Sequence, residues 1–551
     1  MMKSFSSVKA NLARKVSMRS ILAFLAIIFI SIPVITIVGR VNFSYSSNWE
    51  HFSRYILPDA TANTLILVVF TLLASGIIGV LLAVVVTLFD FPMKRFFEWV
   101  LYIPIAIPPY IAAYVYAGML GYTGIVQRLP RNLEMPLPKF LLELTNIMNI
   151  RGAVFIYTIT LYPYIYGVVK SFLQNHSGGF IDISRTLGYR PAGIFLKVIL
   201  PLIRIPLIGG LMLVMMETIS DYGVVKYFNI RTISSAIFSS WFGMGETSVA
   251  IRLSFYIMVF VIAIQAIEEI IRGKRRYNTG AGRSRPITPI RLKGCGKYVV
   301  VFLLAAFIAV AFVIPAAQMV AWAIPAYEKV RLANLGGIIA NTLMYSTLAA
   351  LIILVLNVII VHTRRWMGGK IGFIMGKLTQ LGYSIPGAVI AVGTITAFVA
   401  LDRFLYPLYS FFNQDAKKLV LSTSIAMLVF AFVVRYMAIG FNSVNSAFAK
   451  VGVKYNEAAR TLGMGRTKAM LKIELPMLKN SLTTGFILTF IDIIKELPLT
   501  LLLRPFNFNT LASRAYEYAN DERIHEASVP ALIIIIVCVL AVSMFQRIKS
   551  R

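Results

Sequence analysis

Two pairs of carboxylates interrupt long apolar segments of this chain. The members of each pair lie four residues apart, and the second pair repeats the first 275 positions later: Glu217 with Asp221, and Asp492 with Glu496. A spacing of four places both side chains of a pair on one face of a helix. Charges in an apolar span are costly and usually face a cavity or a partner. The pattern therefore predicts a polar site inside an apolar layer.

Two interpretations of these acids stay open. Carboxylate oxygens suit hard metal cations, so the four acids are transient candidates for the outer mouth of a cation pathway. Alternatively, they pair with basic residues and hold an outer gate together; the candidates are Lys226, Lys495 and Arg504. Glu217 follows Pro201 by about 24 Å of helix, which places it towards the outer side of a bilayer. Neither interpretation assigns a resident metal site.

A basic loop also occurs twice, again 275 positions apart. DISRTLGYRPAGIFLKVILP spans residues 182–201 and EAARTLGMGRTKAMLKIELP spans residues 457–476. Gly463 suits a left-handed helix cap, which predicts helix, turn and helix. A polar loop that recurs in both halves of a membrane protein predicts contact with a symmetric partner. The candidate contact residues are Asp182, Gly188, Pro201, Glu457, Ala458, Ala459, Gly463 and Pro476.

The composition predicts an all-α membrane protein. Of 551 residues, 58% are hydrophobic and only 14% are charged, and the mean hydropathy is +0.77. The net charge of +31 resides largely in short loops between apolar segments, so it indicates membrane topology and not nucleic-acid binding. A bilayer-spanning helix needs about 20 apolar residues. Twelve segments qualify: 20–39, 62–89, 99–119, 152–173, 205–226, 249–271, 298–323, 339–362, 379–401, 418–440, 481–503 and 527–546.

The repeat divides the chain into two halves of six spans. The predicted units are residues 1–272, a basic linker at 273–297, and residues 298–551. An even number of spans per half predicts parallel repeats about an axis along the membrane normal. The two tails and the linker are rich in Lys and Arg, so we expect them, together with both repeated loops, on the cytoplasmic side. Pro108 and its repeat Pro386 predict breaks in the third and ninth spans.

The second loop resembles the EAA loop of ABC importer permeases. Its pattern is Glu457-Ala458-Ala459, three residues, Gly463, nine residues and then Ile473-Glu474-Leu475-Pro476. The first loop departs from it, because Asp182-Ile183-Ser184 replaces the EAA triplet and Val198 replaces the isoleucine. The resemblance implies a coupling helix that docks on an ATPase subunit, with a pair of identical ATPase subunits binding ATP and magnesium. It also implies a periplasmic or lipid-anchored substrate-binding protein.

The residues around the acids narrow the resemblance. The stretches 217–223 and 495–512 resemble segments of ferric-iron ABC importer permeases, which implies uptake of iron(III) across the inner membrane. The chain has no G-x-x-x-x-G-K-[ST] phosphate loop, so we expect a transporter subunit without an ATPase site or cofactor of its own. Permeases for thiamine or a phosphonate share the same loops and remain the alternative. A secondary transporter is the more distant alternative, although it has no reason to repeat a coupling loop.

Overall fold

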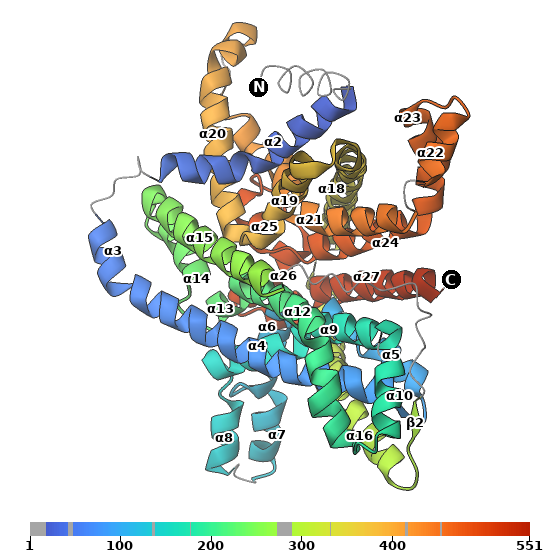
Figure 1. The fold of residues 1–551 in the computed structure, drawn as a ribbon. Helices are drawn as coiled ribbons and strands as arrows, with labels where there is room; N and C mark the ends of the chain where they lie inside the picture. The colour runs from blue at the N-terminus through green and yellow to red at the C-terminus, as the bar shows by residue number, and fades with distance from the viewer. Residues whose placement is uncertain are drawn as a thin grey trace.

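The computed structural model describes residues 18–41, 48–134, 138–176, 178–272, 289–330, 332–413, 417–451 and 454–550, and these residues are almost entirely helical (Figure 1). An all-helical chain is the expected solution in lipid, because a helix satisfies its backbone hydrogen bonds internally. The first half contains α2 (Met18–Arg40), α3 (Trp49–Tyr55), α4 (Leu57–Leu88), β1 (Phe89–Asp90), α5 (Lys94–Val100), η1 (Ile103–Ala106), α6 (Pro109–Leu120), α7 (Ile125–Asn132), α8 (Lys139–Thr145), α9 (Ile150–His176), α10 (Gly178–Thr186), α11 (Pro191–Ile194), η2 (Phe195–Ile199), α12 (Leu200–Ser220), α13 (Gly223–Tyr227), α14 (Ile233–Phe238), η3 (Ser239–Gly243) and α15 (Thr247–Arg272).

The rest of the chain, from the end of the linker onward, repeats the main helices of the first half. It contains β2 (Ile290–Arg291), α16 (Gly296–Ile308), η4 (Ala309–Val313), α17 (Ile314–Ala326), α18 (Leu332–Met367), α19 (Gly369–Ser384), α20 (Gly387–Phe412), η5 (Leu421–Thr423), α21 (Ile425–Val451), α22 (Lys454–Thr461), α23 (Arg466–Ala469), η6 (Met470–Glu474), α24 (Leu475–Ile494), α25 (Pro498–Leu503), α26 (Leu511–Asn520) and α27 (Ile524–Ser550). Strands β1 and β2 pair in parallel, so the last part of the linker lies beside the two residues that follow α4. Residues 273–288 of the predicted linker lie outside the described residues.

The number of membrane spans agrees with the prediction. Within the described residues, 11 helices are long and apolar enough to cross a bilayer, and one further pair of helices, bent by 89° between Ala106 and Pro109, brings the total to 12. The predicted break in the third span is therefore confirmed. The predicted break at Pro386 is present as well, between α19 and α20, but the bounds predicted for the ninth span are wrong, since the span runs from Gly387 to Phe412 and not over 379–401. Pro386 cannot continue α19, and Ile385 before it is extended.

Local backbone features repeat between the halves. Left-handed residues occur at Gly188 and Gly463, and again at Asn229 and Asn507. The π-helical turns η2 and η6 are also 275 positions apart. The recurrence shows that the two halves share a fold, with the offset rising from 275 to 278 after the acid pairs because three residues are added in the second half.

The first membrane helix of each half packs against the other half. Helix α2 lies against α18 and α20, while α17 lies against α6. A glycine lies at both crossings: a Cβ on Gly118 would lie 2.8 Å from Trp322, and one on Gly393 would lie 2.5 Å from the carbonyl oxygen of Pro33. Small residues allow helices to approach closely in membranes. The two halves are consequently interlocked and form shared apolar cores.

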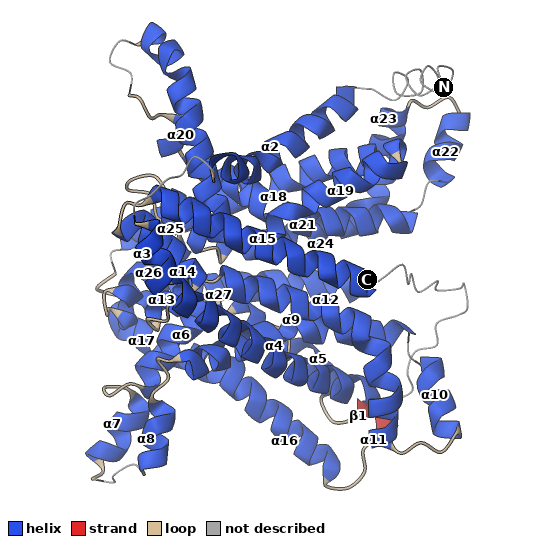
Figure 2. Ribbon diagram, turned by 60° about the vertical axis from the view of Figure 1, so that its left-hand side comes forward, coloured by secondary structure: helices blue, strands red, loops and turns tan. Residues whose placement is uncertain are grey.

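The elements are sorted to two opposite sides of the membrane helices (Figure 2). The repeated loops, which form α10, α11, α22 and α23, lie on one side with the end of α27. The short helices α3, α13, α14, α25 and α26 lie on the other side. The loops are therefore well separated from the carboxylate pairs, which precede α13 and α25.

In each half, a repeat-related hydrogen bond joins a long membrane helix to a short helix. The bond joins α4 to α14 in the first half and α18 to α26 in the second. The backbone N–H of Ile233 donates to Thr64 Oγ1 at 3.0 Å, and that of Leu511 donates to Thr342 Oγ1 at 2.8 Å. Each threonine thereby caps a helix that begins far away in sequence, because the first backbone N–H groups of a helix have no partner within it.

Replacing Thr342 by valine is expected to lower the thermal stability of the purified protein in detergent. The change leaves the buried N–H of Leu511 without an acceptor, which costs about 1–3 kcal/mol. Thr396→Val is the matched control, since Thr396 Oγ1 only donates to the carbonyl of Val392 in its own helix. Equal melting temperatures for the two variants would contradict the capping role.

Candidate functional site

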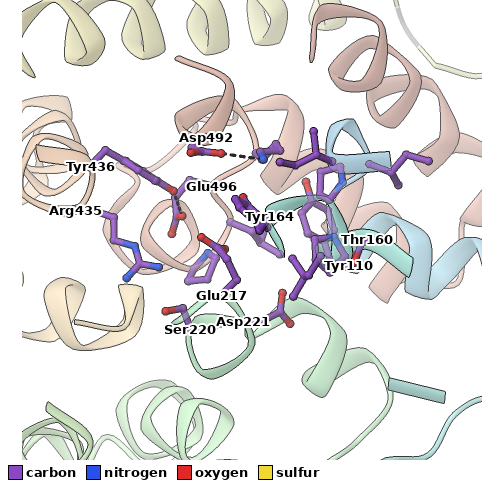
Figure 3. Close-up of a pocket in the computed structure, with 18 residues that line it drawn as sticks. Tyr110, Thr160, Tyr164, Glu217, Ser220, Asp221, Arg435, Tyr436, Asp492 and Glu496 are labelled. Carbon is purple, nitrogen blue, oxygen red and sulfur yellow. Dashed lines mark hydrogen bonds and ion pairs between the residues drawn. The ribbon is translucent and has the colours of Figure 1, made fainter. Parts of the chain in front are cut away.

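The four acids that the sequence singled out line one cavity of about 70 Å³ between the two halves (Figure 3). They reach it from the ends of α12 and α24, which are repeat-related. Two bases and several tyrosines join them. The polar lining residues are Tyr110, Thr160, Tyr164, Glu217, Ser220, Asp221, Arg435, Tyr436, Asp492, Lys495 and Glu496. Four carboxylates thus face two basic side chains.

The second acid of each pair caps a short helix. Asp221 Oδ1 accepts a hydrogen bond from the backbone N–H of Val224 at 2.8 Å, and Glu496 Oε1 accepts one from Leu499 at 3.1 Å. These bonds hold the starts of α13 and α25, whose first N–H groups need acceptors. Asp221 and Glu496 are therefore fixed in place by the backbone that follows them.

A tyrosine of the preceding long helix holds each of these two acids as well. Tyr157 on α9 donates to Asp221 Oδ1 at 2.9 Å, and Tyr436 on α21 donates to Glu496 Oε2. Their positions are not repeat-related, so the halves reach the same arrangement from different turns of the helix. The resulting hydrogen bonds are charge-assisted and strong.

The first acid of each pair faces a base. Asp492 Oδ1 lies 2.9 Å from Lys495 Nζ, and both side chains are mostly buried. Glu217 is attracted by the guanidinium of Arg435 and repelled by the carboxylates of Asp492 and Glu496. Arg435 is itself buried and donates to the carbonyl oxygen of Ile385, just before the break at Pro386.

Two details of the sequence-based prediction are wrong. Helix α24 ends at Ile494, so Glu496 does not share a helix face with Asp492, whereas Asp221 is the C-terminal cap of α12 and its N–H still donates to the carbonyl of Glu217 at 3.0 Å. Of the three bases considered as partners, Lys495 alone lines the cavity. Lys226 is exposed on α13, and Arg504 pairs with Glu517.

Arg435 and the tyrosines were not identified from the sequence. Arg435 occupies the position that Thr160 occupies in the first half, so a search for repeated polar residues passes over it. The signal that could have found it is a lone charge in the middle of an apolar span. Within the described part of the chain, no group of three His, Cys, Asp or Glu side chains is arranged to hold a metal ion.

Both repeated loops have the helix, turn and helix form that the sequence predicts. Gly188 and Gly463 take φ angles of +77° and +81°. The N–H of Tyr189 donates to the carbonyl of Ser184 at 3.1 Å, and that of Met464 donates to Ala459 at 3.0 Å. These six-residue closures are Schellman caps, which end α10 and α22 in the same way.

The tips of the loops are accessible to a partner. Glu457, Ala458, Gly188 and Gly463 are exposed, as are Pro201 and Pro476, whereas Ala459 is buried and Asp182 pairs with Arg185 at 3.4 Å. Directly before the glycines, Leu187 and Leu462 are 70% and 84% exposed. Their recurrence was visible in the sequence, yet they were not among the predicted contact residues. Both turns thus present an exposed leucine at the same repeat position.

The second loop carries an anchor that the first lacks. Glu474 is buried and lies 3.3 Å from Arg365 and 3.8 Å from His362, both at the end of α18. The repeat-related residue in the first loop is Ile199, which is packed in an apolar core. The two loops are thus alike at their tips and different at their bases.

Comparisons with known proteins agree with this two-half architecture. Residues 75–277 and 360–551 each match the family described as "Binding-protein-dependent transport system inner membrane component". An Fe(3+)-transport system permease protein of Haemophilus influenzae is 21% identical over 95% of the chain and 97% of its own length. A ferric transport system permease protein of Actinobacillus pleuropneumoniae is 20% identical over 89% of the chain and 72% of its own length. A sulfate transport system permease protein of Salmonella typhimurium is 22% identical over 38% of the chain and 73% of its own length.

Proposed function

The chain belongs to the family of binding-protein-dependent transport system inner membrane components, and from that premise we propose that it is the membrane-spanning subunit of an ABC importer for ferric iron. In this proposal, both termini and both repeated loops face the cytoplasm. Two copies of a separate ATPase subunit, which bind ATP and magnesium, dock on the loops. A periplasmic or lipid-anchored binding protein delivers the cargo on the opposite side.

The cavity lined by four carboxylates is the observation that supports ferric iron as the cargo. Fe(III) is a hard cation, and hard cations favour carboxylate oxygens. The same electrostatics disfavour the anions named for the relatives that match 38% of the chain or less, such as sulfate, because four acids face only two bases. The relatives named for ferric iron, in contrast, align with both halves.

In the proposed mechanism, each half of the chain transmits a movement from its cytoplasmic loop to the cavity. ATP binding closes the two ATPase subunits and pushes α10 and α22, whose exposed tips are Schellman turns. The movement passes into α12 and α24, because these helices continue from η2 and η6. Since the carboxylates sit at the far ends of α12 and α24, the same movement opens or closes the cavity. This chain contributes the path and the transmission, and it needs no ATPase site.

Uptake of radiolabelled ferric iron by cells with and without the chain tests the proposal. We expect iron uptake to be lost without the chain while thiamine and phosphonate uptake continue. If thiamine or phosphonate uptake alone is lost, the chain is still an ABC importer permease, but its cargo is not iron. A chain with both Glu457 and Gly463 altered serves as a negative control that still occupies the membrane.

A further inference from the structure

The side of the molecule opposite the repeated loops carries a basic pocket of about 420 Å³ beside α13 and α14. Its polar lining includes Lys226, Arg231, Ser235 and Ser239, and its apolar lining includes Phe238 and Phe242. No acid is among the described residues that line it, and neither Lys226 nor Arg231 has a carboxylate within ion-pair distance in the described part of the chain. Two cations therefore face a solvent-filled hollow without a counter-charge.

A second hollow, of about 640 Å³, adjoins this pocket. The two share Asn229, Ile230 and Arg231, and the second adds Arg151 from the start of α9. Asn229 holds the shared edge in a left-handed turn. The positive charge thus extends over a groove and does not rest on one flexible side chain.

The second half of the chain contains the same turn, so the two halves can be compared position by position. Thr232 and Ser235 form a capping box at the start of α14, as Thr510 and Ser513 do at the start of α26. Both boxes follow a left-handed asparagine by three residues. The offset of 278 therefore holds from Asn229 through α14, whereas the caps at the start of α13 and α25 repeat at an offset of 275.

At this offset, the second half contains the carboxylate that the first half lacks. Glu517 is equivalent to Ser239, and Arg504, at the end of α25, precedes the left-handed Asn507 by three residues, as Lys226 on α13 precedes Asn229. Glu517 forms an ion pair with Arg504 and lies 3.3 Å from Arg514. Arg504 also donates to Asn509, whose place in the first half is taken by Arg231. The second half thus pairs two bases with Glu517, whereas the two bases of the first-half pocket, Lys226 and Arg231, have no acid in the described lining.

We propose that the first-half pocket, formed by Lys226, Arg231 and Ser239, binds a carboxylate supplied from outside this chain. That carboxylate takes the place that the Glu517 side chain takes in the second half. Charge-assisted bonds from an ammonium and a guanidinium are the contacts that recognise such a group. The carboxylate is either that of a free small acid or an acidic side chain of the protein that delivers the cargo; the latter source rests on the function proposed above.

The pocket lies close to the acid cavity. Tyr222 lines the pocket, and its neighbour Asp221 lines the cavity. The Tyr222 ring stacks on Phe238 at 3.6 Å and lies 6.2 Å from that of Tyr516 on α26. A carboxylate bound at Lys226 therefore contacts the aromatic layer next to the carboxylates that we assign to the path.

Ser239→Glu supplies the missing carboxylate from within the chain and is the decisive variant. The new side chain occupies the pocket at an effective concentration in the millimolar range, so it competes with any external carboxylate. Ser239→Gln has the same size without the charge and is the matched control. Ser239 is exposed, so both variants are expected to fold. Lys226→Gln with Arg231→Gln removes the site altogether.

The first measurement is a titration of the purified full transporter with glutarate, followed by its melting temperature. We expect wild type and Ser239→Gln to be stabilised, and Ser239→Glu and the double variant to need roughly tenfold more glutarate or to show no response. This arm requires no cargo, so it is readable even if the iron proposal fails. The second measurement is uptake, in cells, of whichever cargo depends on the chain.

Each combination of results decides the proposal. A glutarate response that Ser239→Glu abolishes identifies a free acid as a ligand. No glutarate response, together with uptake that Ser239→Glu reduces and Ser239→Gln does not, identifies an acidic side chain of the delivering protein. If glutarate has no effect and the two Ser239 variants transport equally, the pocket binds no carboxylate and the proposal is overturned.

Discussion

A chain in which Gly463 is replaced by valine is expected to lose cargo uptake while its ATPase partners continue to hydrolyse ATP. Gly463 takes a φ of +81° in an exposed turn, and a Cβ there would meet no other atom. The cost is therefore backbone strain of about 1–2 kcal/mol, and more for a β-branched residue. The turn shifts to relieve the strain, which moves Leu462 and the exposed end of α22 away from the partner.

The expected loss of uptake is at least about tenfold, since repositioning a docking contact costs more than 1.4 kcal/mol. Gly463→Asn is the matched control, because asparagine tolerates the left-handed region and still adds a side chain. We expect it to retain most of the uptake. Radiolabel uptake and ATP hydrolysis in the same vesicles are the measurements. Normal uptake in the valine variant, or equal loss in both variants, would remove the coupling role of the turn geometry.

The second large effect is expected from neutralising the first acid of both pairs. Glu217→Gln combined with Asp492→Asn halves the number of carboxylates in the cavity, so that Asp221 and Glu496 only balance Arg435 and Lys495. A cation then meets a site without net negative charge, so we expect uptake to fall by about tenfold or more. Assembly with the ATPase subunits should persist, because the loops lie on the opposite side of the membrane helices.

The control for this variant separates charge from structure. Asp492 is paired with Lys495, so its loss leaves a mostly buried ammonium without its partner, which destabilises the fold on its own. Adding Lys495→Gln to the double variant removes that unpaired ammonium. If the acids serve the path, the triple variant stays defective in uptake while its melting temperature recovers. Full uptake in the double variant would instead show that these two carboxylates are dispensable.

The sequence alone was enough to predict the architecture, because apolar length and the repeated loops act over long stretches. Hydropathy locates α4 or α27 without knowledge of their neighbours. The same signal misplaced the ninth span, where Pro386 ends one helix and starts another within an apolar stretch. Hydropathy also predicted that the fifth span continues past Asp221. In the structure α12 ends at Ser220, and Asp221 caps the next helix.

The partners of the acids could not be predicted, because they depend on packing between helices that are distant in sequence. Tyr436 and Arg435 reach the cavity from α21, and nothing in the spacing around Glu496 identifies them. Arg504 looked like a partner of the acids only because it is near them in sequence. The structure shows that Glu517, thirteen positions further on, takes that base instead. Residues 273–288 of the linker and the domain boundaries that it defines remain predictions.

The exchange of first helices between the halves has a consequence for synthesis of the protein. Pro33 on α2 packs against the backbone at Gly393, which is made about 360 residues later. At ~5–20 residues per second, this leaves α2 waiting for roughly 20–70 s. Its mean hydropathy of 3.0 is among the highest of the spans, and only a third of it is buried in the finished fold. Helix α2 is therefore suited to wait alone in lipid until its binding groove on α18 and α20 has been synthesised.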